Sequence, residues 1–248
     1  MVRENKKLVK EVSGWLRVFD DGSVDRTWTG PPEVKLAPEH RLPAAIDDGY
    51  TSLLWLRKLA RGEQNEPWLL SYADFSHVFL IGDSSGGNIV HHVAARAGKV
   101  DLSPLRLAGG IPIHPGFVRA ERSKSELEQP QSPFLTLDMV DKFLGLAIPV
   151  GSTKDHPLTC PMGPGAPPLD GLKLPPFLLC IASKDLIIDT EMEYFEAMKK
   201  ANKDVELLIN KGMTHSFYLN KIAVDMDPET ASETEVLITR IKEFIKNH

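Results

Sequence analysis

The chain has 248 residues, of which 42% are hydrophobic and 25% charged, as in an ordinary globular protein of one large domain or two small ones. Its formal net charge of −5 gives no electrostatic reason to expect nucleic acid or an anionic membrane as a partner. The N-terminus has no apolar stretch and no run of 18 apolar residues occurs, so we expect a cytoplasmic protein without signal peptide or membrane span. Cys160 and Cys180 lack metal-ligand spacing, which predicts two free thiols.

The first hundred residues contain clear turn and helix signals. Loose alternation around Asp20-Asp21-Gly22-Ser23 favours a small hairpin, and Gly30-Pro31-Pro32 breaks the chain after it. The expected elements, in chain order, are a hairpin at 15–28, a helix from Pro43 to Gly62, a buried strand at 77–81 and a helix from about Gly87 to Ala97.

The remainder of the chain alternates continuous apolar runs with amphipathic helical patterns. The expected elements are a strand at 107–113, a helix at 136–147, a proline- and glycine-rich crossing at 157–176, a strand at 177–182, a helix with a capping box at Thr190 to Glu193, a strand at 205–209 and a last helix from about Asp227 that buries Leu237, Ile238, Ile241, Phe244 and Ile245. This alternation predicts the α/β class, with a mostly parallel sheet covered by helices on both faces.

A nucleophile motif stands between the strand at 77–81 and the helix that follows it. In Gly82-Asp83-Ser84-Ser85-Gly86 the serine occupies the centre of a G-x-S-x-G string. Placed after a strand and before a helix, such a string forms a sharp elbow that lifts the serine hydroxyl clear of the sheet. Small residues two before and two after the serine allow that turn, and the following helix directs its positive end toward the same point. We therefore interpret Ser84 as a candidate nucleophile rather than a plain turn residue.

A serine nucleophile needs a base, and the base needs an acid that orients it. Asp185 directly follows the strand at 177–182, and His215 lies in the loop after the strand at 205–209. Parallel strands end at the same edge of a sheet, so both residues are expected near Ser84. Asp189 is the alternative carboxylate, although it is the better helix-capping candidate. The competing histidines, at positions 40, 77, 91, 92, 114, 156 and 248, do not occupy a loop that follows a strand and a candidate acid.

Four stretches of the chain carry a family resemblance. In chain order they are Leu36-Ala37-Pro38-Glu39-His40-Arg41-Leu42-Pro43-Ala44-Ala45, Gly82-Asp83-Ser84-Ser85-Gly86-Gly87-Asn88, Lys184-Asp185-Leu186-Ile187-Ile188-Asp189 and His215-Ser216-Phe217. Together they resemble the plant carboxylesterases, which belong to the hormone-sensitive-lipase-like branch of the α/β-hydrolases. The resemblance runs from about residue 10 to the end of the chain, and it implies the α/β-hydrolase fold.

The resemblance also implies a function. It makes Ser84 the nucleophile, Asp185 the acid and His215 the general base of a serine carboxylesterase that acts through an acyl-enzyme. The expected partner is a small carboxylic ester, and no metal or organic cofactor is required. An alternative is a non-catalytic small-molecule binder of the gibberellin-receptor type, which looks like an esterase without the catalytic histidine. The whole of residues 1–248 would form one domain, with residues 1–30 and about 132–150 contributing a cap over the acyl pocket.

The chain departs from the family at one place. The family carries a His-Gly-Gly-Gly loop whose N–H groups form most of the oxyanion hole, whereas this sequence passes from Glu33-Val34 straight to Lys35-Leu36. Early strands of the sheet are therefore expected to be missing, and the Ser85 N–H is the one oxyanion donor that the sequence identifies. Loss of a single donor typically lowers kcat by ~10²–10³. The departure raises a further alternative, an inactive deletion product.

Overall fold

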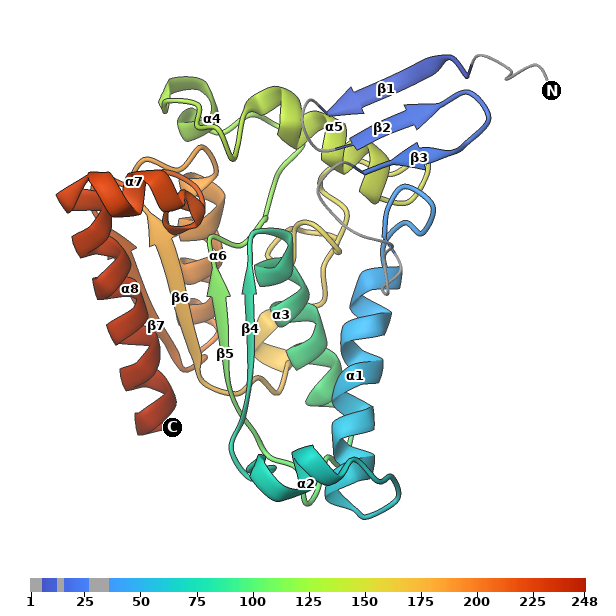
Figure 1. The fold of residues 1–248 in the computed structure, drawn as a ribbon, viewed down its shortest axis with the longest axis vertical. Helices are drawn as coiled ribbons and strands as arrows, with labels where there is room; N and C mark the ends of the chain where they lie inside the picture. The colour runs from blue at the N-terminus through green and yellow to red at the C-terminus, as the bar shows by residue number, and fades with distance from the viewer. Residues whose placement is uncertain (1–5, 13–15, 27–35) are drawn as a thin grey trace.

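Residues 6–12, 16–26 and 36–248 are described by a computed structural model (Figure 1). Its strands are β1 (Leu8–Val12), β2 (Leu16–Phe19), β3 (Val24–Asp25), β4 (Val78–Asp83), β5 (Leu107–Ile113), β6 (Phe177–Ala182) and β7 (Val205–Asn210). Its α-helices are α1 (Ala44–Ala60), α2 (Pro67–Tyr72), α3 (Ser85–Ala97), α4 (Lys124–Glu128), α5 (Leu137–Ala147), α6 (Ile188–Lys200), α7 (Lys221–Met226) and α8 (Pro228–Asn247), with short 3₁₀ turns at Leu169–Gly171 and Phe217–Leu219.

The central sheet has the strand order β4-β5-β6-β7, and every neighbouring pair is parallel. This confirms the predicted α/β class. The strands expected at 107–113 and 177–182 have those same bounds. The strand expected at 77–81 runs from Val78 to Asp83, and the one expected at 205–209 extends one residue further, to Asn210. All six residues of β6 are buried, as a strand with helices on both faces requires.

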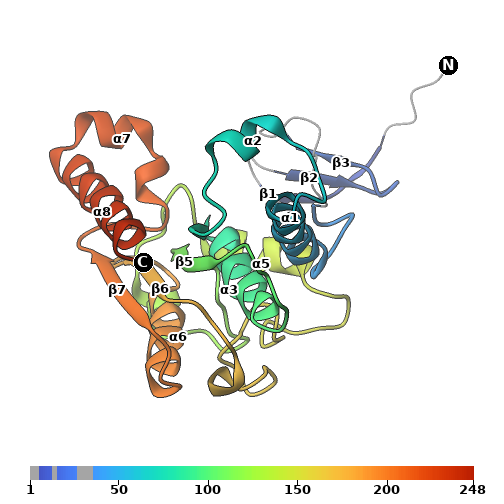
Figure 2. The ribbon, with the colours of Figure 1, turned by 90° about the horizontal axis from the view of Figure 1, so that it is seen from below.

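Helices cover the two faces of this sheet, with α8 on one side and α3 and α6 on the other (Figure 2). Because side chains alternate along a strand, β6 serves both cores. Leu179 and Ile181 pack with Tyr194 of α6, whereas Leu178 packs with Phe244 of α8. The α1 helix lies against α3 through Leu53 and its buried neighbours. In the described residues no helix is long and apolar enough to cross a membrane.

Two local expectations were wrong. The capping box at Thr190 does not form, because α6 begins at Ile188 and the Thr190 hydroxyl instead donates to the carbonyl oxygens of Phe117 (2.7 Å) and Ile187 (2.8 Å). Ile238 is 46% exposed, because a step of one residue rotates it away from the buried face of α8 that carries Leu237. The last helix begins at Pro228, close to the predicted start, and Asp227 caps it, since its side chain accepts from the Thr230 N–H.

The N-terminal strands form a separate antiparallel sheet of order β1-β2-β3, which confirms the expected hairpin. Val12 and Leu16 of this sheet pack against Met139 and Leu146 of α5. Figure 1 shows this sheet and α5 beyond the ends of the central strands at which their arrowheads point. The assignment of a cap to residues 1–30 and 132–150 stays a prediction.

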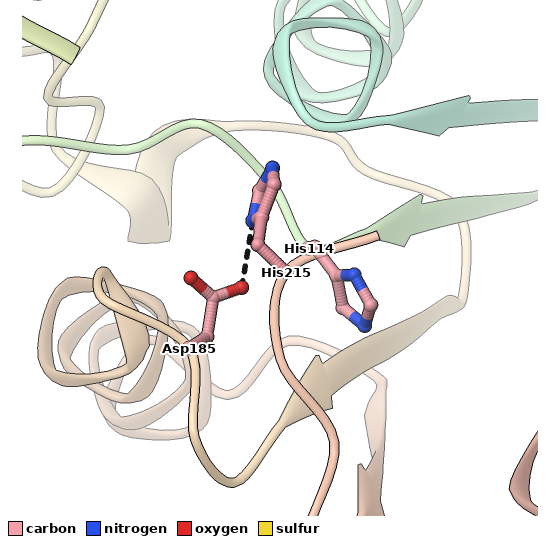
Figure 3. Close-up of side chains that lie close together, drawn as sticks. All are labelled: His114, Asp185 and His215. Atoms are coloured by element: carbon pink, nitrogen blue, oxygen red, sulfur yellow. Dashed lines mark hydrogen bonds and ion pairs between the residues drawn. The ribbon is translucent and has the colours of Figure 1, made fainter. Parts of the chain in front are cut away.

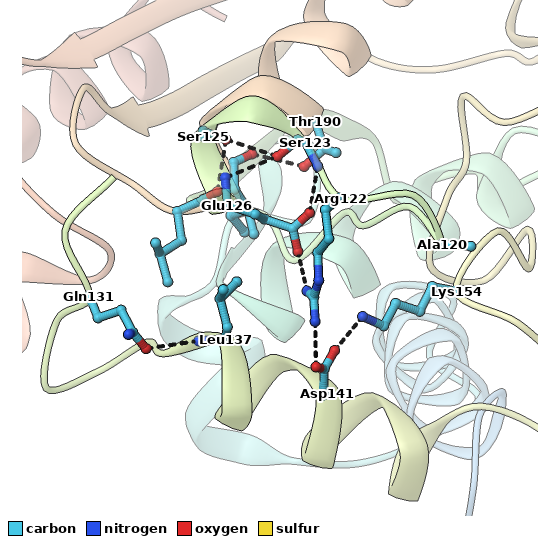
Figure 4. Close-up of polar contacts among 12 residues, drawn as sticks. Ala120, Arg122, Ser123, Ser125, Glu126, Gln131, Leu137, Asp141, Lys154 and Thr190 are labelled. Atoms are coloured by element: carbon cyan, nitrogen blue, oxygen red, sulfur yellow. Dashed lines mark hydrogen bonds and ion pairs between the residues drawn. The ribbon is translucent and has the colours of Figure 1, made fainter. Parts of the chain in front are cut away.

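Polar contacts tie α4 and α5 together (Figure 4). The Arg122 guanidinium donates to Glu126 of α4 at 2.6 Å and also pairs with Asp141 of α5, which binds Lys154 as well. A capping box is present at α4, where the side chains of Ser123 and Glu126 each accept a hydrogen bond from the backbone N–H of the other residue. These ion pairs hold α4 and α5 as one layer beside the carboxyl edge of the sheet.

Within the described residues, β4 pairs only with β5 and forms one edge of the central sheet. Ile81 of β4 stands in register with Ile111 of β5, yet Ile81 is 56% exposed and Ile111 is fully buried. The place after Val34 where the family loop would stand lies outside the described residues. The expected loss of early strands therefore stays a prediction, and the exposed Ile81 is consistent with it.

Candidate active site

The turn at Ser84 is a strained elbow between β4 and α3. Ser84 has φ +54° and ψ −114°, a conformation that non-glycine residues rarely adopt. Its N–H donates to the Ile113 carbonyl at 2.9 Å, and its own carbonyl accepts from the Gly116 N–H at 2.8 Å. The end of β5 thus holds the elbow from both sides of the serine, which fixes the hydroxyl at the carboxyl edge of the sheet.

Glycines permit this elbow for reasons that differ from residue to residue. A Cβ atom on Gly82 would lie 2.4 Å from the Gly86 backbone, and one on Gly87 would lie 2.9 Å from Cα of Pro115. A Cβ atom on Gly86 would meet no described atom within 4 Å. The packing therefore requires glycine at positions 82 and 87, whereas the glycines of the G-x-S-x-G motif are Gly82 and Gly86.

The structure brings Ser84, His215 and Asp185 into one hydrogen-bonded chain. His215 Nε2 lies 2.9 Å from Ser84 Oγ, and His215 Nδ1 lies 2.7 Å from Asp185 Oδ2. Figure 3 shows the bond between the Asp185 carboxylate and the His215 ring. Asp185 is fully buried and His215 is 3% exposed. The Ile187 N–H donates to the second oxygen of Asp185, which fixes the carboxylate. A carboxylate accepts a hydrogen bond from the N–H at Nδ1, so Nε2 carries no proton and accepts a hydrogen bond from the serine hydroxyl.

Asp189, the alternative carboxylate, faces a different partner. Its Oδ2 accepts from the Ser125 N–H at 2.7 Å, and its own N–H donates to the Ser125 hydroxyl. Asp189 therefore joins α6 to α4 and is not hydrogen-bonded to His215. Only Asp185 of the two carboxylates contacts the imidazole.

The electrostatics suit His215 to proton transfer. Burial lowers the pKa of His215, but the charge of Asp185, its hydrogen bond and the charge of Asp83 outweigh burial, and the pKa is raised above 6.5. The other histidines of the core behave in the opposite way. Burial lowers the pKa of His92 to about 4 and that of His91 well below its usual range. His91 bonds Tyr194 at 2.8 Å, and His92 bonds the Leu158 carbonyl, so both serve packing.

Sequence reasoning assigned no role to four residues that surround this chain of hydrogen bonds. Asp83 accepts from the hydroxyls of Ser216 and Tyr218, and His114 Nδ1 accepts from the Ser216 N–H. Burial lowers the pKa of His114 to about 4, so its ring is neutral and carries its proton on Nε2, which has no described partner. The position of Asp83 inside the nucleophile motif was a usable signal, because it fixes Asp83 beside Ser84.

A metal centre is a weaker interpretation of the same residues. His114, Asp185 and His215 each offer one ligand atom, and these atoms lie within 4.8 Å of one another (Figure 3). Asp185 and His215 are, however, bonded to each other, and His114 Nδ1 is engaged by Ser216. Internal hydrogen bonds account for the arrangement. Cys160 and Cys180 are both free and buried, as expected.

The sequence predicts the Ser85 N–H as the oxyanion donor, and its place in the helix is compatible with that role. Ser85 is the first residue of α3, and an N–H at that position has no acceptor within its helix. The segment His114-Pro115-Gly116 lies beside the elbow, but its Gly116 N–H is already bonded to the Ser84 carbonyl.

A parallel sheet with a serine elbow, a histidine and an aspartate at its carboxyl edge defines an α/β hydrolase. The model of the α/β-hydrolase fold family matches residues 32–219, and the chain belongs to that family. Its plant relatives agree with the resemblance seen in the sequence.

Two relatives come from Arabidopsis thaliana. The chain is 39% identical over 184 residues to the gibberellin receptor GID1C, an alignment that covers 74% of this chain and 51% of the receptor. It is 35% identical over 219 residues to carboxylesterase 20, covering 86% of this chain and 63% of the relative. The chain thus spans only about half to two thirds of the length of these relatives. An esterase of Pyrobaculum calidifontis shares the fold, with a TM-score of 0.67, 23% identity and coverage of 86% and 64% of the two chains.

Proposed function

We propose that this protein is a serine carboxylesterase in which Ser84 is the nucleophile, His215 the general base and Asp185 its orienting acid. The observation that carries the proposal is the continuous relay of hydrogen bonds from Ser84 Oγ through His215 to Asp185, at 2.9 and 2.7 Å. Both distances fall in the range that direct proton transfer requires. The similarity to carboxylesterase 20 supports the same reaction class.

The reaction proceeds in two halves. His215 Nε2 takes the hydroxyl proton as Ser84 Oγ attacks the ester carbonyl, and Asp185 stabilises the imidazolium that forms. The imidazolium then protonates the departing alcohol, which leaves an acyl group on Ser84. Water attacks this acyl-enzyme, His215 takes the proton of the water, and the carboxylic acid departs as the proton returns to Ser84.

The rate is expected to be low for this family. The Ser85 N–H offers the oxyanion one hydrogen bond, and each missing donor typically costs ~10²–10³ in kcat, about 3–4 kcal/mol. The test compares hydrolysis of a short p-nitrophenyl ester by this chain and by a version that carries a family-like strand and His-Gly-Gly-Gly loop after Val34. Faster hydrolysis by the version with the inserted loop supports the proposal that the oxyanion hole of this chain is incomplete. Equal rates would mean that another element already completes it.

A second candidate function is non-catalytic binding of a small molecule, which the 39% identity to a gibberellin receptor favours. The presence of His215 in contact with Ser84 favours the enzyme. A fluorophosphonate probe separates the two, because it reacts only with an activated serine. Stoichiometric labelling of Ser84 in the folded protein supports the esterase. A folded protein that resists the probe but binds a gibberellin would establish the receptor-like function.

A further inference from the structure

Two neighbouring residues of the elbow are linked to two neighbouring residues of the histidine loop. Ser84 Oγ bonds His215 Nε2 at 2.9 Å, and the carboxylate of Asp83 accepts from the hydroxyl of Ser216 at 2.8 Å. The second oxygen of Asp83 accepts from the hydroxyl of Tyr218 at 2.5 Å. Asp83 therefore bonds two hydroxyls of the loop that carries His215, and it stands next to Ser84, which bonds His215 itself.

The loop that Asp83 holds has a conformation of high energy. Ser216 has φ +49° and ψ +33°, in the left-handed region that disfavours residues with a side chain. Its N–H donates to Nδ1 of His114 at 2.8 Å, and the His114 N–H donates to the Cys180 carbonyl at 2.8 Å. The turn after His215 is thus secured to the end of β4 through Asp83 and to the end of β5 through His114, which is itself bonded to β6. Such strain persists only where surrounding contacts determine the conformation.

We propose that Asp83 is a positioning residue that fastens the His215 turn to the nucleophile elbow and places a second negative charge beside the imidazole. The inference rests on the proposed function for its catalytic meaning. Its effect on the position and the pKa of the His215 ring can be measured without any ester hydrolysis.

The charges around His215 single out Asp83 as the second contributor. Both of its oxygens take part in hydroxyl hydrogen bonds, which an ionised carboxylate accepts. Burial and the charges of Asp185 and Asp83 raise the pKa of Glu191 well above its usual range. The titratable groups around His215 and the carboxylates beside it are Asp83 of β4, His114 after β5, Asp185 after β6, Glu191 of α6 and Tyr218 of its own loop. Of these, Asp185 and Asp83 raise the pKa of His215.

The experiment is an NMR titration of the His215 imidazole in histidine-labelled protein, repeated in three variants. Asp83→Asn removes the charge, and we expect the titration midpoint of His215 to fall by about half a pH unit or more. Ser216→Ala and Tyr218→Phe each remove one hydrogen bond but keep the charge, so the midpoint should stay near that of the wild type. Asp101→Asn removes an exposed carboxylate elsewhere and serves as the matched charge control.

A second measurement separates positioning from charge. The Ser216→Ala, Tyr218→Phe double variant should react several-fold more slowly with a fluorophosphonate at an unchanged midpoint, because the loop loses its fastening. The inference is overturned if Asp83→Asn leaves the midpoint in place, or if the single hydroxyl variants move it as far as Asp83→Asn does. Should Asp83→Asn fail to fold, the double variant decides, and an unaltered labelling rate refutes the fastening. Absence of ester hydrolysis in the wild type would refute the proposed function without affecting the titration.

Discussion

Replacing Asp185 with asparagine tests the central contact of the proposed relay. Asp185 is fully buried, and its Oδ2 lies 2.7 Å from Nδ1 of His215. Asparagine keeps the size of the side chain but can turn an N–H₂ group toward the ring. That group would donate to Nδ1, which forces the ring proton onto Nε2 and removes the acceptor that Ser84 needs.

The magnitude follows from the role of the carboxylate. In other serine hydrolases, an Asp-to-Asn substitution that holds the histidine in the wrong tautomer lowers kcat about 10⁴-fold. At 1.36 kcal/mol per factor of ten, this corresponds to about 5.4 kcal/mol. The pH dependence also changes. His215 acts as a base only when neutral, and Asp185 is the main reason that its pKa lies above 6.5 despite burial. Without that charge, burial dominates and the pH at which labelling begins must move downward.

The assay is the second-order rate of fluorophosphonate labelling between pH 5 and 9, with circular dichroism to verify folding. Asp189→Asn is the matched control, because it lies four residues away and bonds Ser125 rather than His215. We expect the control to change labelling only a few-fold and to lower stability by about 1 kcal/mol. The reasoning fails if Asp185→Asn labels as fast as the wild type, or if Asp189→Asn produces the larger loss.

Three further outcomes are expected. Ser84→Ala should abolish probe labelling while thermal unfolding stays close to wild type, and persistent stoichiometric labelling would assign the nucleophile elsewhere. Gly87→Ala should lower the free energy of unfolding by about 1–3 kcal/mol, because the new Cβ atom would contact Pro115. Gly86→Ala should cost little, because that position faces open space. Urea unfolding that finds Gly86→Ala the more destabilising would contradict this packing of the elbow. Ile111→Ala should cost about 2–5 kcal/mol and Ile81→Ala well under half of that, because only Ile111 is buried; equal losses would show that β4 is covered in solution.

The sequence by itself determined the local elements and the region of the site. The strands at 107–113 and 177–182 could be predicted from their residues, because a continuous apolar run between breaking residues has few other stable conformations in water. The approach of Ser84, Asp185 and His215 to one another could also be predicted. Each follows a strand of a parallel sheet, and the carboxyl ends of such strands share one edge.

Only the tertiary structure decided between residues of the same chemical type. Asp185 lies in the loop before α6, which begins at Ile188, and Asp189 lies in the first turn of that helix. Asp185 therefore bonds His215, whereas Asp189 bonds Ser125. The role of Asp83 likewise depends on a loop more than 130 residues away along the chain. Local propensity carries no information about such distant partners, because a side chain's contacts are set by how the elements pack. The need for glycine at Gly87 arises in the same way, from the backbone of Pro115 beside it.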